Sequence, residues 1–465
     1  MRANPADEEP LRIETPGLGP RRARPRAPRP SAGGRASATR PSSLLVEEAS
    51  GNRELVAAAQ RIRMAEAEAR IAGAEQLPWL SAGVSGGRER NVLVGFPTPG
   101  GGPFTTTTSR YGVSLDLSWE LDVWGRVEAR KGQAEAGFVA TQEDWVALAH
   151  SLIAQTAKAW FTLREARAQV DLAASTVESR RRTLDLVSER YAQGRRQALD
   201  VHIARQTLAR AETALALRRG LADRARFQLE TLLGRYPSGA IEATEGMPAL
   251  PGPTPAGIPA AILANRPDLR AAEQDLLALR YDISASRAEL LPRISLTASA
   301  GTVSNQLEDL VDGDFGVWSL FGNLVQPIFQ GGRLRAQVDV SEARYREALE
   351  LYANRLLLAF AEVEGALAEE QHLQRQLEAA QVVVREAGAA YDISLERYSQ
   401  GTVGILELLE SERSLFEARS FLIDLERQRL ATRVDLHLAL GGGFGDLVPP
   451  SAEETASTPT PEGHR

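Results

Sequence analysis

Cysteine and histidine, which often serve as nucleophiles or metal ligands, are absent or scattered in this sequence. It contains no cysteine, which excludes disulfides, thiolate metal sites and cysteine nucleophiles. None of its histidines lies three or four residues from another, the spacing that would place two ligands on one helix face. We therefore predict no catalytic residue, no metal site and no cofactor, and so no enzyme. The histidines are His150, His202, His372, His437 and His464.

A glycine-rich stretch near the C-terminus could suggest a phosphate-binding loop. The residues Gly441-Gly442-Gly443-Phe444-Gly445 follow a predicted helix. A phosphate cradle needs the opposite order, in which a strand precedes the glycines and a helix follows them. We therefore interpret the stretch as the end of a helix, where glycine is common.

One group of side chains has a spacing that could serve a function without catalysis. Leu406, Glu410 and Arg413 follow one another at i, i+4 and i+7, so they share one face of a helix. Taken alone, an acid and a base at this distance form an ordinary solvated ion pair. Any further role depends on the elements that position them.

The composition narrows the possible partners. The chain has 465 residues with 54 Lys and Arg against 61 Asp and Glu, a net charge of −7, so it is not as a whole a binder of polyanions. It has no run of about 18 apolar residues, which excludes a transmembrane helix but not a transmembrane β-strand.

The two ends differ from the rest of the chain. We predict a disordered Arg/Pro-rich tail over residues 1–45, with the segment RRARPRAPRP at 21–30, and a second disordered tail over 445–465. The first tail has no apolar run that would form a signal peptide, and the chain has no lipidation cysteine. We interpret residues 1–45 as a solvated tail or a misassigned start rather than a nucleic-acid-binding arm.

Between the tails the sequence contains one pattern twice. About 110 residues of each copy align without a gap, which indicates a true internal repeat. We assign the first structural repeat to 46–234, a connector rich in Pro and Gly to 235–258, and the second repeat to 259–444. The matching segments are GNRELVAAAQ at 51–60 with NRPDLRAAEQ at 265–274, offset by 214, then WGRVEA at 124–129 with GGRLRA at 331–336 and ERYAQG at 189–194 with ERYSQG at 396–401, both offset by 207.

Each copy is predicted to fold as a helix, two strands, a long helix, a tight turn and a second helix. The first helices, about Val46–Glu75 and Pro259–Leu290, end near Leu-Pro, where proline stops a helix. No proline occurs from Gly125 to Gly194, so this helix would be about 100 Å long if continuous. Helices of such length need packing partners along their length.

The predicted strands alternate strictly between apolar and polar residues. Over Tyr111–Glu120 and Arg293–Gly301 this period of two indicates half-buried strands. A soluble sandwich and a transmembrane barrel both have this pattern. The segments Pro97–Ser109 and Asn305–Asp314 are predicted loops. The apolar positions that we assign to membrane strands are Tyr111, Val113, Leu115, Leu117, Trp119, Ile294 and Leu296.

The strand count bears on assembly. Two strands in each copy give four per chain, whereas small closed barrels need about eight. Either the chain's own helices cover the sheet, or several chains contribute strands to one barrel. Three chains would supply twelve strands, and the alternation favours this arrangement.

Several motifs together resemble the TolC family, the outer-membrane factors of tripartite efflux pumps. They are Pro327–Arg333 (PIFQGGR), which enters the second long helix, and Glu396–Gly401 (ERYSQG) at its turn. Asn265–Arg270 (NRPDLR) is similar to the NodT-like drug-efflux branch. The resemblance covers about residues 46–444.

The resemblance implies a fold, partners and a location. The fold would be mainly α with a membrane β part: a homotrimer with a twelve-stranded β-barrel that continues into an α-helical barrel. It would be a passive exit duct of an RND-type tripartite system in the cell outer membrane, in contact with lipid, a periplasmic adaptor (membrane fusion) protein and an inner-membrane transporter, with no nucleic acid. Two alternatives stay open: a channel for type I secretion or metal export, and a soluble coiled-coil scaffold whose basic tail binds nucleic acid.

The resemblance also implies roles for individual residues. The helix turns would be the tips that meet the adaptor, namely Gln193, Gly194 and Arg195 in the first repeat and Gln400, Gly401 and Thr402 in the second. Leu406, Glu410 and Arg413 would form the constriction that closes the channel. Their counterparts in the first repeat, Leu199, Ile203 and Gln206, carry no acid–base pair.

Overall fold

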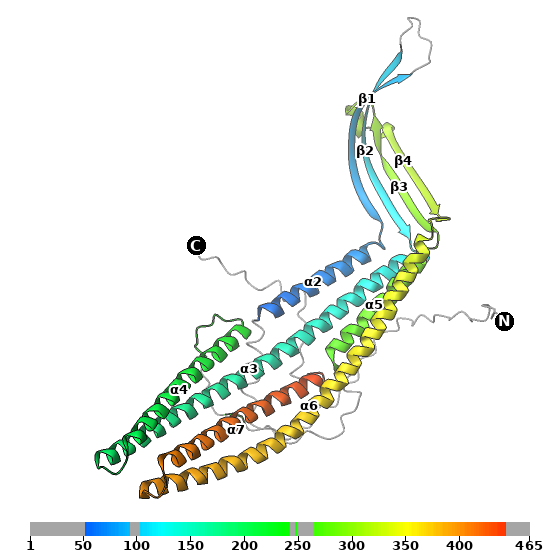
Figure 1. Cartoon of the computed structure of the whole chain (residues 1–465). Helices are drawn as coiled ribbons and strands as arrows, with labels where there is room; N and C mark the ends of the chain where they lie inside the picture. Colours follow the sequence, from blue (N-terminus) through cyan, green and yellow to red (C-terminus); the bar gives the residue numbers. More distant parts are fainter. Residues whose placement is uncertain (1–51, 94–102, 242–246, 249–264, 443–465) are drawn as a thin grey trace, which may run out of the picture.

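The computed structural model describes residues 52–93, 103–241, 247–248 and 265–442. The predicted tails, most of the connector and the predicted starts of the first helices at Val46 and Pro259 lie outside these residues. The molecule is elongated, with a sheet at one end and helices that run away from it to two turns at the other (Figure 1). No helix in the described part of the chain is long and apolar enough to cross a membrane.

The sheet has four antiparallel strands in the order β1-β2-β3-β4. The predicted loop Pro97–Ser109 is wrong from Phe104 onward, because β2 begins there. Its threonines at 105–108 pair with residues 89–92 of β1, and β-branched residues favour such extended pairing. The predicted loop after β3 contains two short 3-10 turns, η2 (Glu308–Val311) and η3 (Gly313–Phe315). The strands are β1 (Trp79–Leu93), β2 (Phe104–Leu121), β3 (Arg293–Ser304) and β4 (Gly316–Val325).

The register gives the sheet one apolar and one polar face. Residues paired directly across antiparallel strands lie on the same face, so each row across the sheet belongs to one face. The two edge strands depart from the pattern in places, since Trp79 and Phe321 stand in one row with Ser118 and Thr297. One row is apolar from edge to edge: Leu80, Leu117, Ala298 and Leu320. The next row is polar from edge to edge: Ser81, Asp116, Ser299 and Ser319.

Six helices form the rest of the described structure. The two long ones have 67 and 68 residues, which corresponds to about 100 Å each, as predicted. Within the described residues, the first helix of the second repeat begins at Pro267, and this proline occupies the first turn, where no backbone donor is needed. The helices are α2 (Arg53–Ala74), α3 (Arg126–Ala192), α4 (Ala198–Leu232), α5 (Pro267–Ala288), α6 (Arg333–Gln400) and α7 (Ile405–Ala439).

The two repeats make the same internal contacts. Asn52 donates from Nδ2 to the Leu232 carbonyl at 2.8 Å, and its counterpart Arg266 donates from Nη1 to the Ala439 carbonyl at 3.1 Å. In each repeat, therefore, the side chain that precedes the first helix ties down the end of the last helix. The duplication read from the sequence is thus also a duplication of contacts.

A second repeated contact joins the sheet to the first helix of each repeat. Trp119 donates from Nε1 to the Gln76 carbonyl at 2.9 Å, and Gln326 donates from Nε2 to the Leu290 carbonyl at 3.1 Å. The donor and the acceptor are each shifted by the same offsets found in the sequence, 207 and 214. The bond survives the change from Trp to Gln because both side chains carry an N–H donor.

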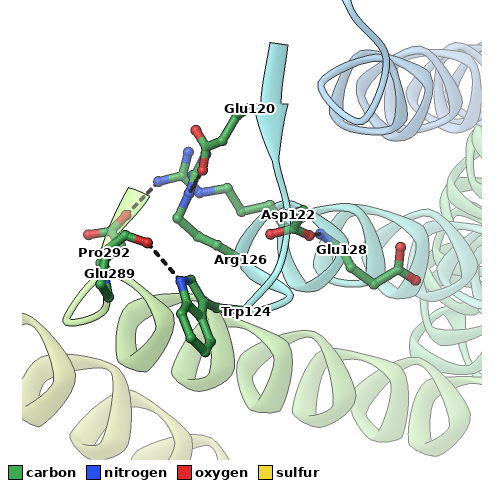
Figure 2. A network of polar contacts seen from close by, with 8 residues as sticks. Glu120, Asp122, Trp124, Arg126, Glu128, Glu289 and Pro292 are labelled. Carbon is green, nitrogen blue, oxygen red and sulfur yellow. Dashed lines mark hydrogen bonds and ion pairs between the residues drawn. The ribbon is translucent and has the colours of Figure 1, made fainter. Parts of the chain in front are cut away.

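Polar contacts fix the junction between the sheet and the long helix α3 (Figure 2). Arg126 holds Glu120 with two bonds of 2.9 and 2.8 Å, across the point where strand changes to helix. Trp124 donates to the Pro292 carbonyl at 2.7 Å, which ties the first repeat to the second. The direction of α3 relative to the sheet is therefore set by both repeats.

Candidate functional site

The predicted tip residues lie at the two helix turns farthest from the sheet (Figure 1). Gly194 has φ +71° and Gly401 has φ +79°, a left-handed conformation that glycine adopts without steric cost. Each turn is closed by a backbone hydrogen bond from its glycine, at 2.9 Å to Tyr191 and at 3.1 Å to Tyr398. All six predicted tip residues are exposed.

A cluster that the sequence analysis missed holds the two tips together. Tyr398 is fully buried between two arginines of the first repeat, with Arg190 at 5.1 Å and Arg196 at 4.9 Å from the ring centre. Arg190 also donates to the carbonyls of Tyr398 and Ser399 at the end of α6, where a positive charge is favourable. The sequence could show that ERY occurs twice, but not which of the two tyrosines is covered.

The structure brings together the predicted constriction residues on α7. Arg413 donates to Glu410 at 2.5 and 3.1 Å, and this hydrogen bonding lowers the pKa of Glu410. Leu406 is 65% exposed on the same helix. Arg413 also bonds Glu417 at 2.7 Å, so the charged group has a third member. Its spacing of four residues from Arg413 was a signal that could have identified it.

These residues line a groove between the two helical hairpins. The groove has a volume of about 480 Å³, and α3, α4 and α7 form its walls. Ile203 and Gln206, the counterparts of Glu410 and Arg413 in the first repeat, line it together with them. Leu199, the counterpart of Leu406, is exposed and not part of this lining.

A buried ion pair behind the groove joins α3 to α7. Arg180 and Glu412 lie 3.1 Å apart, and their side chains are only 9% and 6% exposed. Burial raises the pKa of Glu412, and the charge of Arg180 opposes this effect. The same interface includes a bond from Gln169 to the Ser420 carbonyl at 2.9 Å. Arg180 and Glu412 were not predicted, because charged residues on a long helix more often face solvent.

The predicted membrane positions share the apolar face of the sheet. Trp119 pairs with Leu296, and Leu121 pairs with Ile294, so these side chains lie on one side of β2 and β3. Val113 and Leu115 are exposed on that side, and Tyr111 and Leu117 are half-buried.

The described residues offer no set of three or more histidine, aspartate or glutamate side chains placed to hold a metal ion. The features that the structure brings together at this end are two turns, a groove, an exposed ion pair and a buried one.

Comparison with known proteins gives consistent matches over most of the chain. A family model described as outer membrane efflux protein matches residues 44–235 and 258–442. The solvent efflux pump outer membrane protein SrpC of Pseudomonas putida is 34% identical, over 86% of this chain and 85% of that protein. The cation efflux system protein CusC of Escherichia coli is 31% identical over the same shares.

Solved structures agree with these sequence matches. A crystal structure of CusC has a TM-score of 0.81 to this chain at 30% identity, and covers 92% of this chain and 100% of that chain. The outer-membrane channel OprN also has a TM-score of 0.81, at 29% identity, and covers 87% of this chain and 90% of that chain.

Proposed function

This chain belongs to the outer membrane efflux protein family, and on that premise we propose that three copies form one channel that works with a periplasmic adaptor and an inner-membrane transporter. The chain itself is an outer-membrane efflux channel and not an enzyme. This assignment replaces the alternative of a soluble scaffold that binds nucleic acid. The resemblance to an efflux family drawn from the sequence is confirmed.

The observation that carries the proposal is the sheet, which has an apolar row on one face, a polar row on the other and two edge strands. The row Leu80, Leu117, Ala298 and Leu320 would face lipid, and the row Ser81, Asp116, Ser299 and Ser319 would face a water-filled lumen. β1 and β4 are the edges of the sheet within one copy. An edge strand exposes unpaired backbone groups, and a neighbouring copy could pair with them.

The tips and the groove fit a gated mouth at the opposite end. We assign Gln193, Gly194, Arg195, Gln400, Gly401 and Thr402 to adaptor contact, because they are exposed and lie farthest from the sheet. We assign Leu406, Glu410 and Arg413 to the constriction. The exposed Leu406 would narrow the mouth, and the Glu410–Arg413 pairs, one on α7 of each copy, would hold it shut.

For the substrate we propose small molecules delivered by an RND-type transporter. Export of metal ions is the second candidate, favoured by the likeness to the cation efflux protein CusC. The NRPDLR motif does not select between them. Arg266 of this motif donates hydrogen bonds to Asp268, Glu362 and the Ala439 carbonyl. In this structure the motif therefore connects helix ends.

The test is the conductance of the purified protein in a planar lipid bilayer. The double variant Glu410→Ala/Arg413→Ala should raise the mean conductance several-fold, because the constriction loses its charged pair. The control is Glu178→Ala/Arg182→Ala, which removes an exposed pair of the same kind on α3. If the first variant conducts like the unaltered protein, the gate lies elsewhere, and if no variant forms pores, the channel assignment is wrong.

A further inference from the structure

The two repeats lie side by side in the same order at every level between the sheet and the tips. Near the sheet the helices lie in the order α2-α3-α5-α6, near the tips in the order α4-α3-α7-α6, and the strands run from β1 to β4 (Figure 1). At each level, one edge belongs to the first repeat and the other edge to the second. The centre of every layer is a junction between the two repeats.

Equivalent helices of the two repeats differ strongly in the number of their residues that are buried. α3 packs against α7 across the central junction, whereas their counterparts α6 and α4 make no comparable packing with each other among the described residues. Twenty-two of the 67 residues of α3 are buried, but only nine of the 68 in α6. Likewise ten residues of α7 are buried and six of α4, both of 35 residues. α6 and α4 therefore have faces that the chain itself does not cover.

One contact of the central junction has an exposed counterpart on these faces. Gln169 donates to the Ser420 carbonyl at 2.9 Å, and the Ser420 hydroxyl donates back to Oε1 of Gln169 at 2.8 Å. A shift by the repeat offset of 207 leads to Gln376 on α6 and Thr213 on α4. These residues carry the same amide and hydroxyl groups, and both are exposed.

A second contact between the repeats also has an exposed counterpart. It lies about 30 Å farther along the helices, by their rise per residue. Arg190 stacks on Tyr398 and bonds its carbonyl at 2.6 Å, and Tyr398 is 0% exposed. The same shift leads to Arg397 and Tyr191. Arg397 is exposed and Tyr191 is 49% exposed, so the residues equivalent to Arg190 and Tyr398 both lie on the surface of a single copy.

We propose that a second copy of this chain docks the edge formed by α2, α4 and the last turn of α3 on the α6 edge of the first, so that Gln376 bonds Thr213 of the next copy and Arg397 stacks on Tyr191 of the next copy. The contact is head-to-tail, and repetition of such a contact closes into a ring when the rotation allows it. The proposal rests on the proposed trimer and adds to it the residues at which copies meet.

The buried ion pair of the central junction does not belong to this interface. The shift places Ala387 and Arg205 where Arg180 and Glu412 stand, so no acid faces a base there. Amide–hydroxyl and arginine–tyrosine contacts would join neighbouring copies, and a buried ion pair would join the repeats within each copy. The two kinds of junction would be alike in geometry and different in charge.

Cross-linking tests the proposal directly, because the chain has no cysteine of its own. The variant Gln376→Cys/Thr213→Cys, treated with a short bismaleimide in detergent or lipid, should give covalent dimers and trimers on a denaturing gel. Each single-cysteine variant should give none, because head-to-tail contact keeps identical residues apart. The matched control Gln169→Cys/Ser420→Cys should cross-link within one chain only and give no ladder.

A second pair near the tips, Arg397→Cys/Tyr191→Cys, should give the same ladder independently. The native mass of each variant is measured in parallel. A trimeric mass without covalent dimers, when the control pair reacts, overturns this interface and leaves the proposed channel intact. A monomeric mass for the unaltered protein overturns the interface together with the proposed trimer.

Discussion

At the scale of single residues, the charged side chains on the two faces of α7 lie in different environments, one exposed and the other buried. Glu410 and Arg413 face an open groove, and Glu412, two residues from Glu410, is buried against α3. An exposed pair can break and form with little change in stability, whereas a buried charge that loses its partner is costly. The exposed pair thus suits a gate and the buried pair suits a fixed joint.

We predict that Arg180→Leu lowers the free energy of unfolding by about 3–5 kcal/mol at neutral pH, because Glu412 is left buried without its partner. The double variant Arg180→Leu/Glu412→Leu should recover most of this loss. Burial already raises the pKa of Glu412, so folding favours its protonated form, and the penalty in Arg180→Leu should shrink as pH falls through that raised pKa. Denaturant unfolding across pH measures this, and a penalty independent of pH would contradict it.

The pH dependence of conductance follows from Glu410. The hydrogen bonds from Arg413 lower its pKa, so Glu410 keeps its charge, and the pair holds, as pH falls through the ordinary glutamate range near about 4.3. Conductance should rise only in more acidic solution, where the carboxylate is protonated. In Arg413→Lys, which lacks the bidentate fork, the rise should occur at higher pH. Bilayer recordings from pH 7 to 3 would show identical curves if the pair has no part in gating.

At the scale of elements, the tight turns set the spacing of the helical hairpins. Gly401 closes the α6–α7 turn with φ +79°, whereas Gly404, three residues on, has φ −81°. The two glycines therefore form a matched pair, of which only one needs a left-handed backbone.

We predict that Gly401→Ala destabilises the α6–α7 turn by about 1–2 kcal/mol, the cost of placing a Cβ in the left-handed region. Gly404→Ala should have a much smaller effect, because alanine adopts a negative φ without strain. Amide hydrogen exchange around Ile405 should be faster in the first variant only. Equal exchange in the two variants would mean that the left-handed turn does not limit local opening.

At the scale of the whole molecule, the register of the four strands aligns an apolar row on one face of the sheet and a polar row on the other. Leu320 lies on the apolar face at 59% exposure, and its neighbour Ser319 lies on the polar face. If the apolar face meets lipid, a charge there is expensive and a charge on the other face is not.

We predict that Leu320→Arg destabilises the membrane-inserted protein by about 2–4 kcal/mol if it lies near the middle of the bilayer, whereas Ser319→Arg is tolerated. The readout is the yield of folded protein in lipid vesicles and in the outer-membrane fraction. A greater loss for Ser319→Arg would mean that the two faces are assigned the wrong way round.

The local pattern of the sequence determined much of this protein. The duplication, the two helices of about 100 Å and the alternating strands are all written in short-range periodicity, and each was predicted from it. Glu410 and Arg413 could be paired for the same reason, since their spacing on a helix needs no tertiary information. The extent of β2 was missed, because its threonine run was interpreted as a loop.

Only the tertiary structure decided which member of each repeated set is buried. Tyr191 and Tyr398 stand in the same local sequence, yet one is half-exposed and the other is enclosed by Arg190 and Arg196. The pairing of Arg180 with Glu412 was also decided by the tertiary structure, because the two residues lie on different helices. The physical reason is that both repeats carry similar local sequence patterns, but within one chain they meet at only one junction, at its centre. Whether a residue is buried therefore depends on whether it lies at this junction and not on its local sequence.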